Sequence, residues 1–174
     1  MTLEHRRAIV HLNEKDISEG ETIIRYAGIQ KGEPFITLSP ETRSGGGVKD
    51  WPYNSFLELI KRINSKFQVQ IITFVSPSSK MKYPGTIVVN NAPTIRSVAS
   101  VINQSSLHLG LDNGLTHIAS AFETKIVSIH LGHPIEVCGI ISPNSVTVSN
   151  GIFCDPRSIS VDTVFKEVAK LFLP

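Results

Sequence analysis

Charge, cysteine and long apolar runs are all scarce in this sequence of 174 residues. Charged side chains make up 18% of the residues, below the usual fraction of about 25%, and the formal net charge is only +2. So small a charge does not indicate a nucleic-acid partner or a charged membrane surface. The apolar runs fall well short of the ~18 residues that a membrane-spanning helix needs, so we expect no transmembrane segment.

The two cysteines, Cys138 and Cys154, form no C-x-x-C pair, so we expect reduced structural thiols. The N-terminal residues carry two arginines but neither a long apolar run nor a small-residue cleavage site. This absence predicts no signal peptide and a cytoplasmic protein. The hydrophobic content of 41% is ordinary, and the length suits one domain that buries roughly 70% of its unfolded surface.

Apolar strands and helices alternate from residue 35 onward. Residues 1–34 are predicted to form an N-terminal arm with a short helix over 19–27, because Ser18 and Glu21 fit a capping box and Gly28 fits a helix stop. The alternation predicts an α/β, Rossmann-like domain over 35–174, with a doubly wound, mostly parallel sheet of about six strands. Strands are expected at 35–39, 69–75, 86–90, 107–111, 125–130 and 146–149, and helices at 52–66, 94–104, 115–122 and 161–172.

The fold class itself predicts where a ligand binds. In a doubly wound sheet the ligand lies beyond the carboxyl ends of the strands, where the strand order reverses. With the common order 3-2-1-4-5-6, that point lies between the first and fourth strands. The loop over 40–50 and the turn over 112–117 follow these two strands, so we expect them to meet at one site.

The first of these loops has the chemistry of an anion site. Its glycines, 45–47, allow backbone N–H groups to approach a phosphate closely. Thr42 and Ser44 offer hydroxyl donors, and Lys49 offers a positive charge. A solvated surface lysine and a flexible glycine loop are the plain alternatives.

The turn after the fourth strand also suits an anion. Its residues Gly114, Leu115 and Thr116 open a helix whose first N–H groups have no partner within the helix. The helix can be capped by either residue just before it, and a histidine in its first turns can donate to a phosphate oxygen. Across both loops the candidate ligand-binding residues are Thr42, Ser44, Lys49, Asp112, Asn113, Gly114, Leu115, Thr116 and His117.

Other sites are not indicated. The sequence contains no Walker A motif, no G-x-G-x-x-G after the first strand and no G-x-S-x-G. His130 and His133 are spaced like a weak metal pair, but no Cys, Asp or Glu stands near them at ligand spacing, so we expect no metal. Trp51 is expected to pack beneath the first loop rather than to bind a ligand.

Three segments are similar to the motifs of a known family. The segment 49–52, Lys-Asp-Trp-Pro, resembles the K-x-W-P segment of glycosyltransferase family 9, the ADP-heptose:lipopolysaccharide heptosyltransferases. The segment 112–121, DNGLTHIASA, is similar to that family's D-[ST]-G-[LP]-x-H-[LI]-A-A-A signature, and 124–132 is similar to the strand that follows it. The resemblance covers roughly residues 20–150.

The resemblance implies the C-terminal lobe of a two-lobed GT-B glycosyltransferase, the lobe that binds an ADP-linked sugar donor. It implies that the N–H groups of 114–116 bind the diphosphate with His117 close by, that Asp112 holds their turn, and that Thr42 or Ser44 supplies hydroxyls. Lys49 would be the catalytic residue, because it would neutralise charge on the leaving ADP. No metal or other cofactor is implied.

The resemblance also implies partners. The family's acceptor-binding lobe supplies the Asp general base and has no counterpart here, so a separate lobe or subunit would bring the glycan or glycolipid acceptor, and the protein could lie at the inner membrane. Glu41 stands where many members have glycine, and residues 76–80 lack the carboxylate that usually reaches the ribose. Two alternatives stay open: a non-catalytic nucleotide-binding or interaction module, and another GT-B enzyme.

Overall fold

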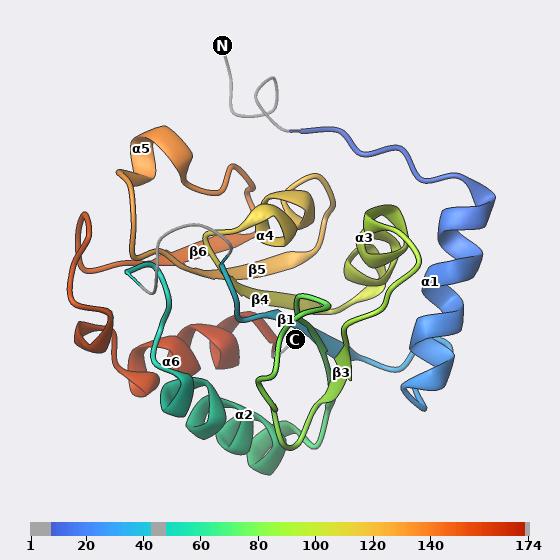
Figure 1. Cartoon of the computed structure of the whole chain (residues 1–174), viewed down its shortest axis with the longest axis horizontal. Helices are drawn as coiled ribbons and strands as arrows, with labels where there is room; N and C mark the ends of the chain where they lie inside the picture. The colour runs from blue at the N-terminus through green and yellow to red at the C-terminus, as the bar shows by residue number, and fades with distance from the viewer. Residues whose placement is uncertain (1–7, 43–47, 173–174) are drawn as a thin grey trace.

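A single parallel sheet of six strands forms the centre of the protein (Figure 1). The computed structural model describes residues 8–42 and 48–172. Its strand order, β3-β2-β1-β4-β5-β6, confirms the order expected from the sequence, and every neighbouring pair runs parallel. The strands are β1 (Phe35–Ser39), β2 (Gln70–Phe74), β3 (Ile87–Val89), β4 (Leu107–Leu111), β5 (Lys125–Ile129) and β6 (Ser145–Val148).

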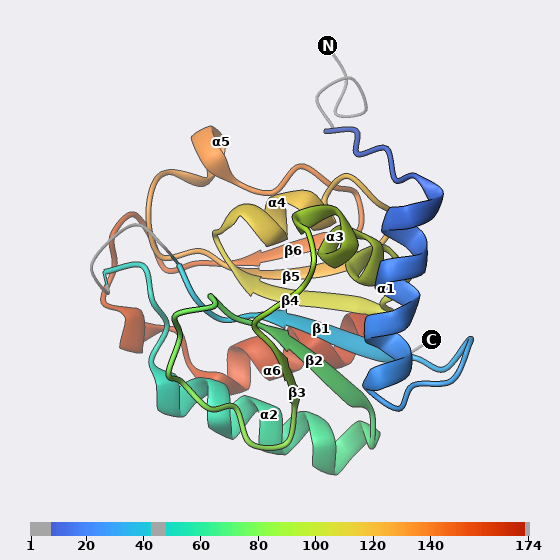
Figure 2. The same cartoon turned by 45° about the vertical axis from the view of Figure 1, so that its right-hand side comes forward.

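Helices cover both faces of this sheet, as Figures 1 and 2 show. Helices α2 (Tyr53–Phe67) and α6 (Val161–Phe172) pack together on one face. Helices α1 (Glu14–Tyr26), α3 (Ile95–Gln104) and α4 (Gly114–Ala119) lie on the other. All five residues of β1 and of β4 are buried, as expected for central strands with a hydrophobic core on either side.

The start of helix α1 differs from the prediction. The helix begins at Glu14 instead of residue 19, because a capping box forms between Asn13 and Asp16, with two backbone-to-side-chain hydrogen bonds of 2.9 Å. The same Asp16 carboxylate accepts a hydrogen bond of 2.8 Å from Arg96 on α3. Ser18 and Glu21 therefore lie inside the helix, and their capping role was predicted wrongly.

Two further elements were not predicted from the pattern. A single turn of helix, α5 (Ile135–Cys138), and a short 3-10 turn (Pro156–Ser158) are both too brief to show periodicity. Helix α4 ends at Ala119, three residues earlier than expected. No described helix has the length and apolar character needed to cross a membrane.

Trp51, which we expected to pack beneath the first loop, is a core residue at the start of α2. Its side chain is 2% exposed, packs edge-on against Phe56, and donates a hydrogen bond of 2.9 Å to the carbonyl of Ile159. This contact ties the end of the first loop to the segment before α6.

Helix α1 depends on one glycine for its packing against α3. A Cβ atom at Gly20 would lie 2.4 Å from Ser100 Oγ and 3.2 Å from the carbonyl oxygen of Ser97. Gly20→Ala should therefore lower the free energy of unfolding by about 1–3 kcal/mol, because the two helices must separate. In chemical denaturation the control Ser18→Ala, on the exposed face of α1, should stay within about 0.5 kcal/mol of the wild type. Equal stabilities for the two variants would show that α1 does not pack as described.

Candidate functional site

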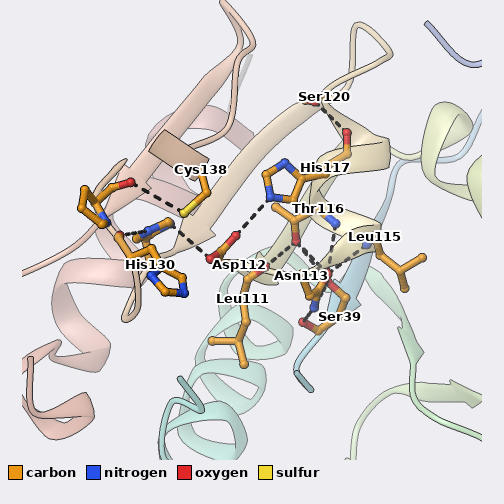
Figure 3. Close-up of polar contacts among 12 residues, drawn as sticks. Ser39, Leu111, Asp112, Asn113, Leu115, Thr116, His117, Ser120, His130 and Cys138 are labelled. Carbon is orange, nitrogen blue, oxygen red and sulfur yellow. Dashed lines mark hydrogen bonds and ion pairs between the residues drawn. The ribbon is translucent and has the colours of Figure 1, made fainter. Parts of the chain in front are cut away.

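The ends of β1 and β4 are tied together by one side chain, that of Asn113 (Figure 3). Its amide nitrogen donates to the carbonyl oxygens of Ser39, at 3.1 Å, and Glu41, at 3.0 Å. Its amide oxygen accepts from the backbone nitrogens of Leu115, at 3.0 Å, and Thr116, at 3.1 Å. One residue thus fixes the exit of β1 and caps α4, so the two predicted loops do meet where the strand order reverses.

A cavity of about 610 Å³ opens beside this junction, a size within the usual range for small-molecule sites. The ends of β1, β2, β3 and β4 and the start of α3 supply its walls. Five of the predicted site residues line it: Thr42, Asp112, Asn113, Gly114 and Leu115. Within the described residues, Lys49, Thr116 and His117 stand outside its lining, and Ser44 lies outside the described residues.

Two of the backbone donors at the turn are already engaged. The N–H groups of Leu115 and Thr116 have no partner within the helix, and both donate to the side chain of Asn113, one of the two residues expected to cap α4. The Thr116 hydroxyl is fully buried and donates to the carbonyl of Leu111 at 2.7 Å. Gly114 differs, because it lines the cavity and a Cβ placed on it would meet no atom within 4 Å.

Asp112 does not cap the helix; it pairs with a histidine. Its carboxylate lies 3.1 Å from Nε2 of His117, whose side chain is 43% exposed. This hydrogen bond, supported by the positive charge of Lys49, keeps the pKa of Asp112 below its ordinary value against the opposing effect of burial. Asp112 is therefore a carboxylate anion at neutral pH.

The first loop brings Lys49 to the same edge of the sheet. The aliphatic chain of Lys49 lies over Gly132, where an added Cβ would be 2.7 Å from Lys49 Cε. Thr42, at the other end of the loop, donates its hydroxyl to Asp50 at 2.6 Å and also lines the cavity. Both residues are thus near the junction, Thr42 at the cavity wall and Lys49 on the side of Asp112.

A carboxylate that the sequence analysis did not assign also borders the cavity. Glu41 follows β1, yet its carboxylate accepts hydrogen bonds from the backbone N–H of Ser76, at 3.0 Å, and from the hydroxyl of Ser79. Residues 76–80 were noted as lacking an acidic group. The structure supplies one to the same place from a neighbouring strand, which a reading along the chain cannot detect.

Beneath the junction lies a buried polar network centred on His108 of β4. The imidazole is inaccessible to solvent; its Nδ1 lies 2.9 Å from Thr37 Oγ1, and its Nε2 lies 3.1 Å from Ser39 Oγ and 3.3 Å from Thr116 Oγ1. A Cβ at Gly110 would come within 2.3 Å of two of these hydroxyls, so glycine makes room for the network. The network holds β1, β4 and α4 in one arrangement, and it was missed because His108 reads as one residue of an apolar strand.

Comparisons with known proteins agree with this fold. The family model described as glycosyltransferase family 9 (heptosyltransferase) matches residues 11–166. No curated protein sequence matches the chain. The E. coli ADP-heptose LPS heptosyltransferase II has 16% identity and a TM-score of 0.74, with 94% of this chain covering 53% of that one.

Two other solved structures are similar at comparable identity. A family 9 glycosyl transferase from Veillonella parvula has 14% identity and a TM-score of 0.78, with 95% of this chain covering 54% of that one. E. coli heptosyltransferase WaaC with ADP has 14% identity and a TM-score of 0.70, with coverages of 82% and 45%. The chain thus spans about half the length of these proteins, and at such identities the likeness concerns the fold.

The buried histidine predicts a pH dependence of stability. Burial lowers the pKa of His108 to about 3, so this group is neutral in the folded protein while the unfolded chain binds a proton below about pH 6.5. The free energy of unfolding should therefore fall as the pH drops from 6.5 toward 4, by up to about 1.4 kcal/mol per pH unit. Denaturation of His108→Gln should give a flatter profile, whereas the exposed control His11→Gln should follow the wild type. Parallel profiles for all three proteins would contradict the account.

Proposed function

The chain belongs to glycosyltransferase family 9, the heptosyltransferases, and from this premise we propose that it is the lobe that binds the nucleotide-sugar donor. The donor in this proposal is an ADP-linked, heptose-like sugar, which is transferred to lipopolysaccharide or a related glycan. The observation that carries the proposal is the cavity at the β1–β4 junction, which Gly114 borders without a side chain.

The chemistry of the cavity suits a nucleoside diphosphate. One side is apolar, with Phe74, Val89 and Val98 among its lining residues, and can take a planar base. The other side carries the open backbone at Gly114, which suits a diphosphate. Ligand pockets commonly combine an apolar wall with a few polar groups that fix orientation.

In a glycosyl transfer from such a donor, the bond between the sugar and the diphosphate breaks, and negative charge develops on the leaving ADP. Lys49 lies on the Asp112 side of this junction, and in the proposal its positive charge stabilises the leaving ADP. Asp112 is hydrogen-bonded to His117, so we assign it the role of holding the turn and not that of the general base. The general base comes from an acceptor-binding lobe on another segment or subunit.

The cap on α4 supports a second candidate function. A non-catalytic module of the same fold would bind nucleotide and lack transferase activity on its own, and the Asn113 cap on two N–H groups of α4 favours weak phosphate binding. The first candidate acts in the cytoplasm, at the inner face of the membrane that presents a glycolipid acceptor. Sugar transfer after addition of an acceptor-binding lobe supports the first candidate; persistent inactivity with intact ADP binding supports the module.

Calorimetry with ADP tests the donor site directly. The wild-type chain should bind ADP, and Lys49→Ala should weaken binding about tenfold, because a charge-assisted contact worth roughly 1.5–3 kcal/mol is lost. The control Lys31→Ala, at an exposed position after α1, should bind like the wild type. Absence of ADP binding at millimolar concentration by a folded wild-type chain would contradict the proposal.

Gly114→Val refines the same test. A Cβ at this position meets no atom within 4 Å, so we expect thermal stability to stay close to that of the wild type. ADP binding should be lost, because the ligand can no longer approach the backbone. A variant that is equally stable and binds ADP normally would place the diphosphate elsewhere.

Glu41 is proposed to accept a hydrogen bond from the ribose. A carboxylate that binds a ribose hydroxyl is a common device in nucleotide sites of this fold class. The wild type should therefore prefer ADP over 2′-deoxy-ADP by about tenfold, and Glu41→Gln should lose most of that preference. The control Glu21→Gln, on the exposed side of α1, should keep it. An unchanged preference in Glu41→Gln would limit Glu41 to holding residues 76–79.

A further inference from the structure

His130, just beyond β5, presents an unexplained polar atom. Its side chain is 1% exposed, and within the described parts of the chain its Nδ1 has no hydrogen-bond partner. Its other ring nitrogen, Nε2, lies 2.6 Å from the carbonyl oxygen of His133. A carbonyl can only accept, so Nε2 carries the proton, and in the neutral ring Nδ1 carries a lone pair.

That lone pair faces two further electron donors, which Figure 3 shows together. The second carboxylate oxygen of Asp112 lies 4.0 Å from His130 Nδ1. The sulfur of Cys138, on α5, completes a group in which one atom from each of the three residues lies within 4.8 Å of the others. A buried lone pair and a carboxylate that face each other without a hydrogen bond call for a positive charge between them.

We propose that Asp112, His130 and Cys138 form a binding site for a borderline-soft divalent cation of the Zn²⁺ class. Imidazole nitrogen, thiolate sulfur and carboxylate oxygen are the three ligand types that this ion takes, and three protein ligands leave a fourth position for water or another molecule. The three ligand atoms lie within 4.8 Å of one another, so in this proposal a bound ion draws them closer together.

The hydrogen bonds around the proposed ligands resemble those around known metal sites in proteins. The proton on Nε2 of His130 is bonded to a backbone carbonyl, which fixes the ring and aims Nδ1 at the site. The other oxygen of Asp112 is held at 3.1 Å by His117. Each of these two ligands therefore has an outer hydrogen bond that orients it.

The structure revises the reasoning from sequence. The sequence places no Cys or Asp at ligand spacing near His130 and His133, so it predicts no metal there. Folding brings both to His130 from other segments, whereas His133 contributes its carbonyl and not its ring. This site does not rest on the proposed nucleotide function, since its ligands are defined without a donor.

Lys49 is the competing cation. Its positive field reaches both Asp112 and Cys138, so its charge opposes a bound metal. Lys49→Ala should consequently tighten metal binding, although the donor proposal predicts that the same change weakens ADP binding. The opposite signs separate the two proposals in one variant.

Titration of the untagged, fully reduced 174-residue chain with Co²⁺ tests the site, because a cobalt–thiolate bond gives a near-ultraviolet charge-transfer band and tetrahedral Co²⁺ gives strong visible bands. We expect about one Co²⁺ per chain, displaced by Zn²⁺. Cys138→Ser should abolish the thiolate band, and Asp112→Asn should weaken binding by more than about tenfold. The matched control Cys154→Ser, which removes the other free thiol, should leave the titration unchanged.

Other results would overturn the proposal. A wild-type chain without a thiolate band at millimolar Co²⁺ would mean that a proton, and not a metal, lies between His130 and Asp112. A band that survives in Cys138→Ser or disappears in Cys154→Ser would place the metal elsewhere. Circular dichroism of each variant shows whether it is folded; if Cys138→Ser does not fold, Asp112→Asn decides, and binding equal to the wild type overturns the site.

Discussion

The architecture of the site depends on the side chain of Asn113. Its amide nitrogen holds the chain as it leaves β1, and its amide oxygen caps α4. In a doubly wound sheet, the connections that follow β1 and β4 turn toward opposite faces of the sheet, and this leaves a crevice between the two strand ends. One side chain with donors and an acceptor bridges that crevice, and the cavity opens beside it.

The layer beneath this bridge is polar, which is unusual between two buried strands. His108 joins the hydroxyls of Thr37, Ser39 and Thr116, and Gly110 leaves the space they need. A buried network with satisfied members specifies one arrangement more strictly than an apolar core of the same volume. The network therefore links the end of β1 to β4 and to the start of α4, directly beneath the cavity.

Much of the fold could be predicted because it follows from local pattern. The β-branched runs of β2 and β5 and the spacing of Phe56, Leu59 and Ile63 on α2 carry their own signals, and the strand order followed from the fold class. The sequence could not predict which of Asp112 and Asn113 caps α4, nor that the carboxylate of Glu41 lies at the end of β2. The cap depends on which of several possible hydrogen bonds forms. The position of Glu41 depends on a contact between segments far apart in the chain.

The central claim is that the β1–β4 junction of this family 9 domain binds the donor nucleotide. Amide chemical-shift mapping of the isotope-labelled chain during titration with ADP tests it most directly, because it reports the location of the ligand whatever its affinity. The account predicts that the largest shifts fall on Glu41, Thr42, Asn113, Gly114 and Leu115, around the cavity. Shifts confined to another surface, or none at saturating ADP, would contradict it.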